Sequence, residues 1–139
     1  MLHHDKLDAF RAKYNDLAFL VFRVLIGLFF IVHGVQKVFG LAGKDPQPLA
    51  SLMGVAGIIE LVGGLFIVLG LFTGLVALIC AIEMAVAYFM AHAPKGFLPL
   101  LNGGELALIY FAVFLYLIFE GGGKYSLDAK LCEKCTPRK

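Results

Sequence analysis

The fold is decided by residues 49–91, which read LASLMGVAGIIELVGGLFIVLGLFTGLVALICAIEMAVAYFMA. Only two side chains in this stretch are charged, Glu60 and Glu83, and a short Thr73-Gly74 turn divides it into two apolar runs. About 20 apolar residues suffice for a helix to cross the hydrocarbon core of a bilayer. The stretch therefore predicts two membrane-spanning helices, 49–72 and 74–91, joined as an antiparallel hairpin.

Two further apolar runs flank this hairpin, at 17–39 and at 104–119. The runs at 74–91 and 104–119 are short for a bilayer, and the last helix could begin earlier, near Pro99. The chain of 139 residues is 60% apolar and 16% charged, whereas a soluble domain is about 45–50% apolar and about 25% charged. We therefore predict an all-α fold, an integral membrane four-helix bundle in contact with the lipid bilayer. The formal net charge of +2 is too small to indicate nucleic-acid binding.

The polar ends of the chain set the expected boundaries and orientation. Residues 1–16 form a polar segment, residues 17–120 the membrane domain with four spans, and residues 121–139 a polar tail. Leu7, Phe10 and Tyr14 recur at helical spacing beside basic residues, which fits either a helix on the membrane surface or a plain extension of the first span. Because basic residues gather in both tails, the positive-inside rule places both termini in the cytoplasm and the protein in the cytoplasmic membrane.

Three ionisable residues fall well inside the predicted spans: Arg23, Glu60 and Glu83. Such groups are costly in lipid and need a partner or a function. At 1.5 Å per residue, all three lie roughly 9–17 Å from the cytoplasmic side, so we expect them to meet in one layer. Glycines beside Arg23 and beside Glu60 favour close packing of the first two helices. We predict that Arg23 pairs with one glutamate as a structural clamp; the alternative is a site for a polar headgroup or a proton relay.

A second polar set is expected toward the outer surface and contains His33, Lys37, His92 and Glu105. A carboxylate at a helix N-terminus is favoured by the helix dipole, and His33 also fits an ordinary helix histidine. Alternatively, the two histidines and the carboxylate gather beside loop 92–104, where they would exchange protons with a quinone or bind a metal weakly. The candidate polar site therefore comprises Arg23, His33, Lys37, Glu60, Glu83, His92 and Glu105.

The remaining features concern thiols and small residues. Cys132 and Cys135 form one CxxC in the C-terminal tail, which supplies half of a zinc site, a redox pair or an incidental pair. Small residues at 77, 81 and 85 form a ridge that would face a second subunit in a homo-oligomer. The sequence contains no haem, flavin or iron–sulfur motif, so no cofactor is evident and a quinone is the candidate.

The chain resembles the DoxX family of membrane proteins. The resemblance rests on RVLIGLFFIVHGVQKVFG, GIIELVGGLFIVLGLFTG, the mid-helix Glu83 and GGELALIYFAVFLYLIFEGGGKYSLD, in the expected order from about Arg23 to Asp128. It implies a four-helix bundle in the cytoplasmic membrane, with family polar positions at Arg23, Lys37, Glu60, Glu83 and Glu105. His33 and the C-terminal CxxC lie outside the family pattern. Relatives are linked to a thiosulfate:quinone oxidoreductase, to complexes that handle thiol or oxidative stress and, more distantly, to cargo receptors and assembly chaperones.

Three functions follow from these features. The first is a quinone-reactive or redox accessory subunit, in which the buried polar residues bind a quinone headgroup and a partner oxidoreductase supplies electrons. In this case the chain takes part in catalysis as a subunit of a membrane oxidoreductase. The second is a non-enzymatic assembly factor or scaffold, in which the buried charges serve folding alone. The third is a small transporter or channel, for which four helices are few and no inverted repeat is evident.

Overall fold

The computed structural model describes residues 2–131, and within them every regular element is helical. The elements are α1 (Leu2–Phe39), α2 (Leu52–Leu69), α3 (Thr73–Ala87), a π-helical turn η1 (Tyr88–His92), a 3-10 turn η2 (Ala93–Lys95), α4 (Pro99–Asn102), α5 (Glu105–Glu120) and α6 (Leu127–Leu131). The all-α prediction is confirmed. The four long helices α1, α2, α3 and α5 begin and end within a few residues of the predicted runs, apart from the start of α1.

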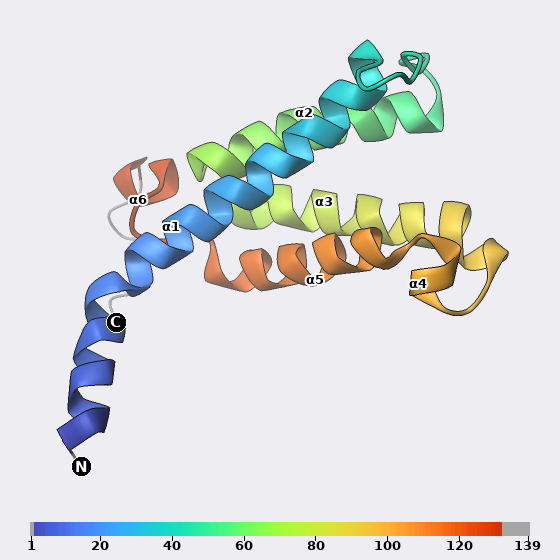
Figure 1. Ribbon diagram of the computed structural model, residues 1–139. Helices are drawn as coiled ribbons and strands as arrows, with labels where there is room; N and C mark the ends of the chain where they lie inside the picture. Colours follow the sequence, from blue (N-terminus) through green and yellow to red (C-terminus); the bar gives the residue numbers. More distant parts are fainter. Residues whose placement is uncertain (1, 132–139) are drawn as a thin grey trace.

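The helices pack as two pairs. Helix α1 lies along α2, and α3 lies along α5, while α2 and α3 join the two pairs as a hairpin (Figure 1). Helix α1 is one continuous helix from Leu2, so the segment before residue 17 continues the first span. This is the helical extension that the sequence left open, and it projects beyond the other helices (Figure 1).

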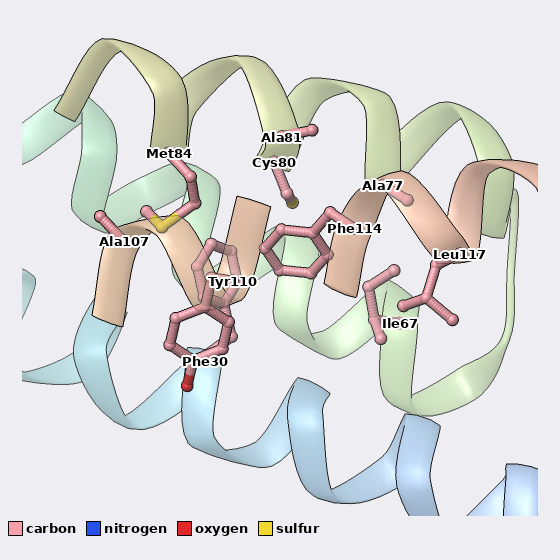
Figure 2. Packing of buried hydrophobic residues seen from close by; sticks show 10 residues of the cluster. All are labelled: Phe30, Ile67, Ala77, Cys80, Ala81, Met84, Ala107, Tyr110, Phe114 and Leu117. Atoms are coloured by element: carbon pink, nitrogen blue, oxygen red, sulfur yellow. The ribbon is translucent and has the colours of Figure 1, made fainter. Parts of the chain in front are cut away.

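The core lies between the two pairs and draws on all four long helices. Phe30 of α1, Ile67 of α2 and Phe114 of α5 are fully buried in one cluster with Cys80 of α3, and Figure 2 shows the Phe114 ring next to Cys80. The rings of Phe30 and Phe114 meet edge to face, with centroids 4.8 Å apart, a geometry that aromatic pairs prefer. The core is thus aromatic at its centre, where α1 crosses α5.

Small residues of α3 let α5 approach closely. Ala77 and Ala81 are buried at 0% and 2% exposure and lie within this core (Figure 2). The prediction that these alanines face a second subunit is therefore wrong, because α5 of the same chain covers them.

The connections differ in detail from the expectation. The hairpin turn comprises Gly70 to Phe72, three residues earlier than predicted, and Thr73 already belongs to α3. Gly70 has φ +65°, and its N–H and that of Leu71 bond to the last carbonyls of α2, a typical glycine-terminated helix end. Pro99 begins the separate short helix α4, because Gly103 at φ +73° interrupts the chain before α5.

Large apolar side chains cover much of the exposed surface, and several charged side chains are buried. Large side chains such as Val32 of α1, Val62 of α2 and Ile82 of α3 are 62%, 48% and 56% exposed, whereas Arg23 and Glu60 are 1% and 3% exposed. In water this arrangement would be unfavourable, since apolar groups belong inside and unpaired charges outside. Within residues 2–131, three helical stretches, Lys6–Phe39, Leu52–Leu69 and Thr73–Lys95, are long and apolar enough to cross a membrane.

Candidate functional site

The interface between α1 and α2 sets the level of each polar side chain. A Cβ atom added to Gly27 would lie 2.8 Å from the Gly64 carbonyl oxygen, and one added to Gly34 would lie 2.7 Å from the Gly57 carbonyl oxygen. These two antiparallel glycine pairs hold the backbones in contact, as small residues do in membrane helices. The close packing of these two faces, predicted from their glycines, is therefore confirmed. It places Arg23 opposite Val68, near the end of α2.

Arg23 binds backbone carbonyl groups. Its guanidinium donates to the carbonyl oxygens of Ile67 at 2.5 Å and Val68 at 2.8 Å in α2, and of Tyr125 at 2.7 Å in the C-terminal segment. The last carbonyls of a helix have no partner within the helix, and a guanidinium presents several donors in a fixed plane. Arg23 therefore closes the end of α2 and fastens the segment after α5 to it.

The predicted ion pair between Arg23 and a glutamate is wrong. Within residues 6–131, no ion pair of Arg23 is found, because its level is about 12 Å along the helix axis from that of Glu60. A neighbouring carboxylate, Asp128, serves the same end of the bundle differently. It accepts hydrogen bonds from the backbone N–H groups of Phe72 and Thr73 at 2.7 and 2.9 Å and so caps α3.

Lys37 takes the partner predicted for Arg23. Its ammonium lies 2.6 Å from Glu60 Oε1, and the two side chains are 20% and 4% exposed. Such a charge-assisted hydrogen bond, largely shielded from water, is stronger than an exposed one. The sequence predicts Lys37 in an outer cluster with His33, whereas the structure places it at the inner site with Glu60.

Glu83 lies level with Glu60 on the facing helix. In the α2–α3 hairpin, a Cβ added to Gly63 would lie 2.7 Å from Cys80 Sγ, so these two positions oppose each other. Glu60 precedes Gly63 by three residues, and Glu83 follows Cys80 by three. Both carboxylates therefore lie about one helical turn farther than Gly63 and Cys80 from the connection between α2 and α3. Glu83 is 8% exposed, and both of its carboxylate oxygens, like Oε2 of Glu60, have no hydrogen-bond partner among the described residues.

The inner site is therefore one cation and two buried carboxyl groups: Lys37, Glu60 and Glu83, here called the inner carboxylate site. Lys37 neutralises one carboxylate, and the other has no countercharge within reach among the described ion pairs. An unpaired buried carboxylate in such surroundings takes up a proton or binds a ligand that supplies a donor. The site can thus hold and release a proton or accept hydrogen bonds from a bound molecule.

The remaining predicted residues lie apart from this site, each in its own surroundings. The His33 ring packs edge-on against the Tyr110 ring of α5, with centroids 5.9 Å apart. His92 Nδ1 lies 3.2 Å from the Asn102 carbonyl oxygen, and Glu105 is exposed at the start of α5. Across the described residues, no group of three or more His, Cys, Asp and Glu side chains could hold a metal ion. The weak metal site, which the sequence offered only as an alternative for this outer set, is therefore not formed among the described residues.

Two polar residues that organise the bundle were missed from the sequence. Asn102 is 5% exposed; its amide donates to the Gly96 carbonyl at 2.8 Å and accepts from the Gly104 N–H at 2.8 Å, which shapes the loop before α5. Asp128 caps α3, and its place in the Tyr-Ser-Leu-Asp signature was the available signal. The candidate thiols Cys132 and Cys135 lie outside the described residues.

Comparison with known proteins gives one family. The DoxX family model matches residues 18–93. An uncharacterized protein of Haemophilus influenzae is 42% identical over 129 residues, covering 88% of this chain and 96% of its own length. "Inner membrane protein YqjF" of Escherichia coli is 33% identical over 131 residues (88% and 98%), and "Putative oxidoreductase CatD" of Bacillus subtilis is 33% identical over 109 residues (69% and 81%). No solved structure matches the chain.

Proposed function

Because the chain belongs to the DoxX family of membrane proteins, we propose that it is a small inner-membrane accessory subunit of a redox system, working with a partner oxidoreductase. The inner carboxylate site would exchange protons with a quinol headgroup bound in the bundle. The observation that carries this proposal is Glu83, a buried carboxyl group with no hydrogen-bond partner among the described residues, level with the Lys37–Glu60 pair. One relative bears the name of an oxidoreductase, which agrees with this direction.

The residues of the site fit a hydroxylated aromatic headgroup. Glu83 and Glu60 present three carboxylate oxygens that accept no hydrogen bond from any described residue, and a quinol presents two hydroxyl donors. Lys37 offers a cation at the same level, suited to a carbonyl oxygen of the oxidised ring. When bound, such a group supplies reversible redox chemistry coupled to protons. The chain itself would supply a proton acceptor at Glu83 and a fixed charge pair at Lys37 and Glu60.

The site explains why a carboxyl group is placed in the membrane interior. An acid or base works best when its surroundings hold its proton loosely at the operating pH, and a second carboxyl group beside the first separates their tendencies to ionise. Lys37 donates a hydrogen bond to Glu60 Oε1 and so compensates the charge of that carboxylate. Glu83 is thereby left as the group that takes up and gives back the proton.

The proposal is tested by extracting the protein in mild detergent and measuring the quinone that co-purifies with it. We expect a quinone in the native protein, loss of it in Glu83→Gln, and retention in the control Asp45→Asn, which removes an exposed carboxylate from the loop between α1 and α2. The amide keeps the shape of the side chain but cannot accept a proton. Protein that carries no quinone, together with unchanged quinone-linked respiration after deletion of the gene, would refute the redox role.

We further propose that α5 is a fourth membrane span and that both termini are cytoplasmic. Helix α5 has 16 residues, about 24 Å at 1.5 Å per residue, which is short for a core of about 30 Å and needs α4 or a thinned bilayer to complete it. A reporter fused after Lys139 should be active on the cytoplasmic side, and one inserted at Lys44 on the opposite side. A fusion after Lys139 that reports the outer side would refute the four-span arrangement.

A scaffold role is the second candidate, and one observation favours it. The part of α1 before residue 17 exposes the rings of Phe10 and Tyr14, which pack against each other with centroids 4.7 Å apart. An exposed apolar face on a projecting helix suits contact with a partner or a membrane surface. If deletion of residues 2–13 abolishes function while Glu83→Gln has no effect, the scaffold role replaces the redox role.

A further inference from the structure

A crevice lies between α1 and α5, away from the inner carboxylate site. It has a volume of about 290 Å³ and is lined by Asn15, Ala18, Phe19, Phe22, Tyr116 and Glu120. The end of α5 comes beside α1 here (Figure 1). The apolar run of α1 begins at Leu17 and that of α5 ends at Phe119, so the crevice lies where hydrocarbon gives way to lipid headgroups.

Three aromatic rings form the apolar wall of the crevice. Phe19, Phe22 and Tyr116 lie with ring centroids 6.1 to 6.3 Å apart in every pairing, and the Tyr116 ring meets both phenylalanine rings edge to face. Aromatic faces carry negative potential and attract cations, and groups of such rings recognise ammonium groups. Tyrosine in particular is common at the level of the headgroups.

The polar wall is acidic. Glu120 is the last residue of α5, where the helix dipole also favours a cation. No described residue forms an ion pair with Glu120, so its carboxylate is free to accept hydrogen bonds. Asn15 adds an amide oxygen from α1. These acceptors suit an ammonium that still carries N–H donors better than a fully methylated one.

A cation for an adjoining phosphate lies at the same end of the bundle. Lys124 lies in the segment after α5 and is largely exposed. Its ammonium lies 3.4 Å from the carboxylate of Asp16, the residue after Asn15. Asp16 and Glu120 are acidic and Lys124 is basic, so the rim of the crevice carries charges of both signs. Such a rim complements a zwitterionic headgroup. A headgroup that joins a primary ammonium to a phosphate through two carbons matches this pattern.

We propose that the crevice between α1 and α5 binds the aminoethyl phosphate headgroup of phosphatidylethanolamine, with the ammonium at Glu120 and the aromatic rings and the acyl chains along the apolar surface of α1. The site is independent of the proposed redox function, because it shares no residue with the inner carboxylate site. It would hold one lipid in the leaflet on the side of the two termini.

The test is native mass spectrometry of the full chain released from nanodiscs that contain equal amounts of phosphatidylethanolamine and phosphatidylglycerol. We expect one retained phosphatidylethanolamine, and about tenfold weaker retention in Glu120→Gln, the loss of one charge-assisted hydrogen bond. Tyr116→Leu should weaken retention as well. The control Asp8→Asn removes an exposed carboxylate at the same end of α1 and should leave the preference unchanged.

A second arm adds free phosphoethanolamine to the released complex. We expect displacement of the lipid, because the crevice is proposed to recognise the headgroup, and lack of displacement at high concentration would count against headgroup recognition. Equal retention of the two lipids by the native protein, or a preference that survives Glu120→Gln, would overturn the proposal.

Discussion

Replacing Glu83 by methionine should make the protein more stable. The carboxyl group is 8% exposed and has no hydrogen-bond partner among the described residues, and an unsatisfied buried polar group costs about 1–3 kcal/mol. Methionine has a similar length and no polar atom of that kind, so Glu83→Met should raise the free energy of unfolding by about 1–3 kcal/mol. Glu83→Gln should gain less, because the amide also lacks a partner.

The matched change at the paired carboxylate should have the opposite sign. Glu60→Met leaves the Lys37 ammonium without its partner at 2.6 Å, and breaking a buried pair from one side costs about 3–5 kcal/mol. Lys37 is 20% exposed and can turn toward water, so we expect the lower end of that range. The double variant Lys37→Met/Glu60→Met removes both charges and should return to native stability or exceed it.

Cys80 provides the probe for this assay. It is fully buried, so its thiol reacts with a labelling reagent only when the bundle opens. With Cys132→Ser and Cys135→Ser as background, unfolding by SDS in mixed micelles is followed by thiol labelling. The result that would refute the reasoning is a loss of stability in Glu83→Met comparable to that in Glu60→Met, since it would mean that Glu83 is as well paired as Glu60.

Three further variants test the packing. Gly34→Ala would press a Cβ against the backbone nitrogen of Leu61 in α2 and should lower stability by about 1–3 kcal/mol. Gly74→Ala, with its nearest atom at 3.2 Å, should cost much less, and SDS unfolding compares the two variants. Arg23→Lys should lower the yield of folded protein, because an ammonium cannot reproduce a planar guanidinium that serves three carbonyls; size-exclusion chromatography in detergent measures this, and full recovery would contradict it. Asp128→Ala should cost about 0.5–2 kcal/mol through the lost cap of α3, with an unchanged unfolding midpoint as the contrary result.

The fold was accessible from the sequence because lipid leaves few choices. Backbone groups in a bilayer must be paired within the segment, so the apolar runs had to be helices, and the tight connection fixed α2 and α3 as a hairpin. The glycine faces of α1 and α2 could also be read from spacing alone. The start of α1 was less clear, since a polar amphipathic segment continues a helix or lies beside a membrane with the same pattern.

The partners of Arg23 and Lys37 could not be read from depth alone. Every side chain of a helix leans toward the N-terminus of that helix. In antiparallel helices, Arg23 therefore leans away from Glu60 and toward the carbonyl groups at the end of α2, whereas Lys37 and Glu60 lean toward each other. Depth in the membrane, counted in residues from the surface, carries no information on this lean, and for that reason it pairs Glu60 with the wrong cation.

The polar groups at the two ends of the α1–α2 interface differ in how well they are hydrogen-bonded, and this difference indicates which end serves function. At the end near Arg23, three donated hydrogen bonds and the Asp128 cap satisfy most of the groups involved, and Arg23 Nε is the exception among the described residues. Packing and helix capping therefore account for the polar residues at this end. At the level of Glu83, no hydrogen bond to a described residue satisfies the carboxyl group, and an apolar side chain of the same size would fold better. A group that lowers stability without a structural return needs another reason to be there, and a proton or a ligand with hydroxyl donors supplies one.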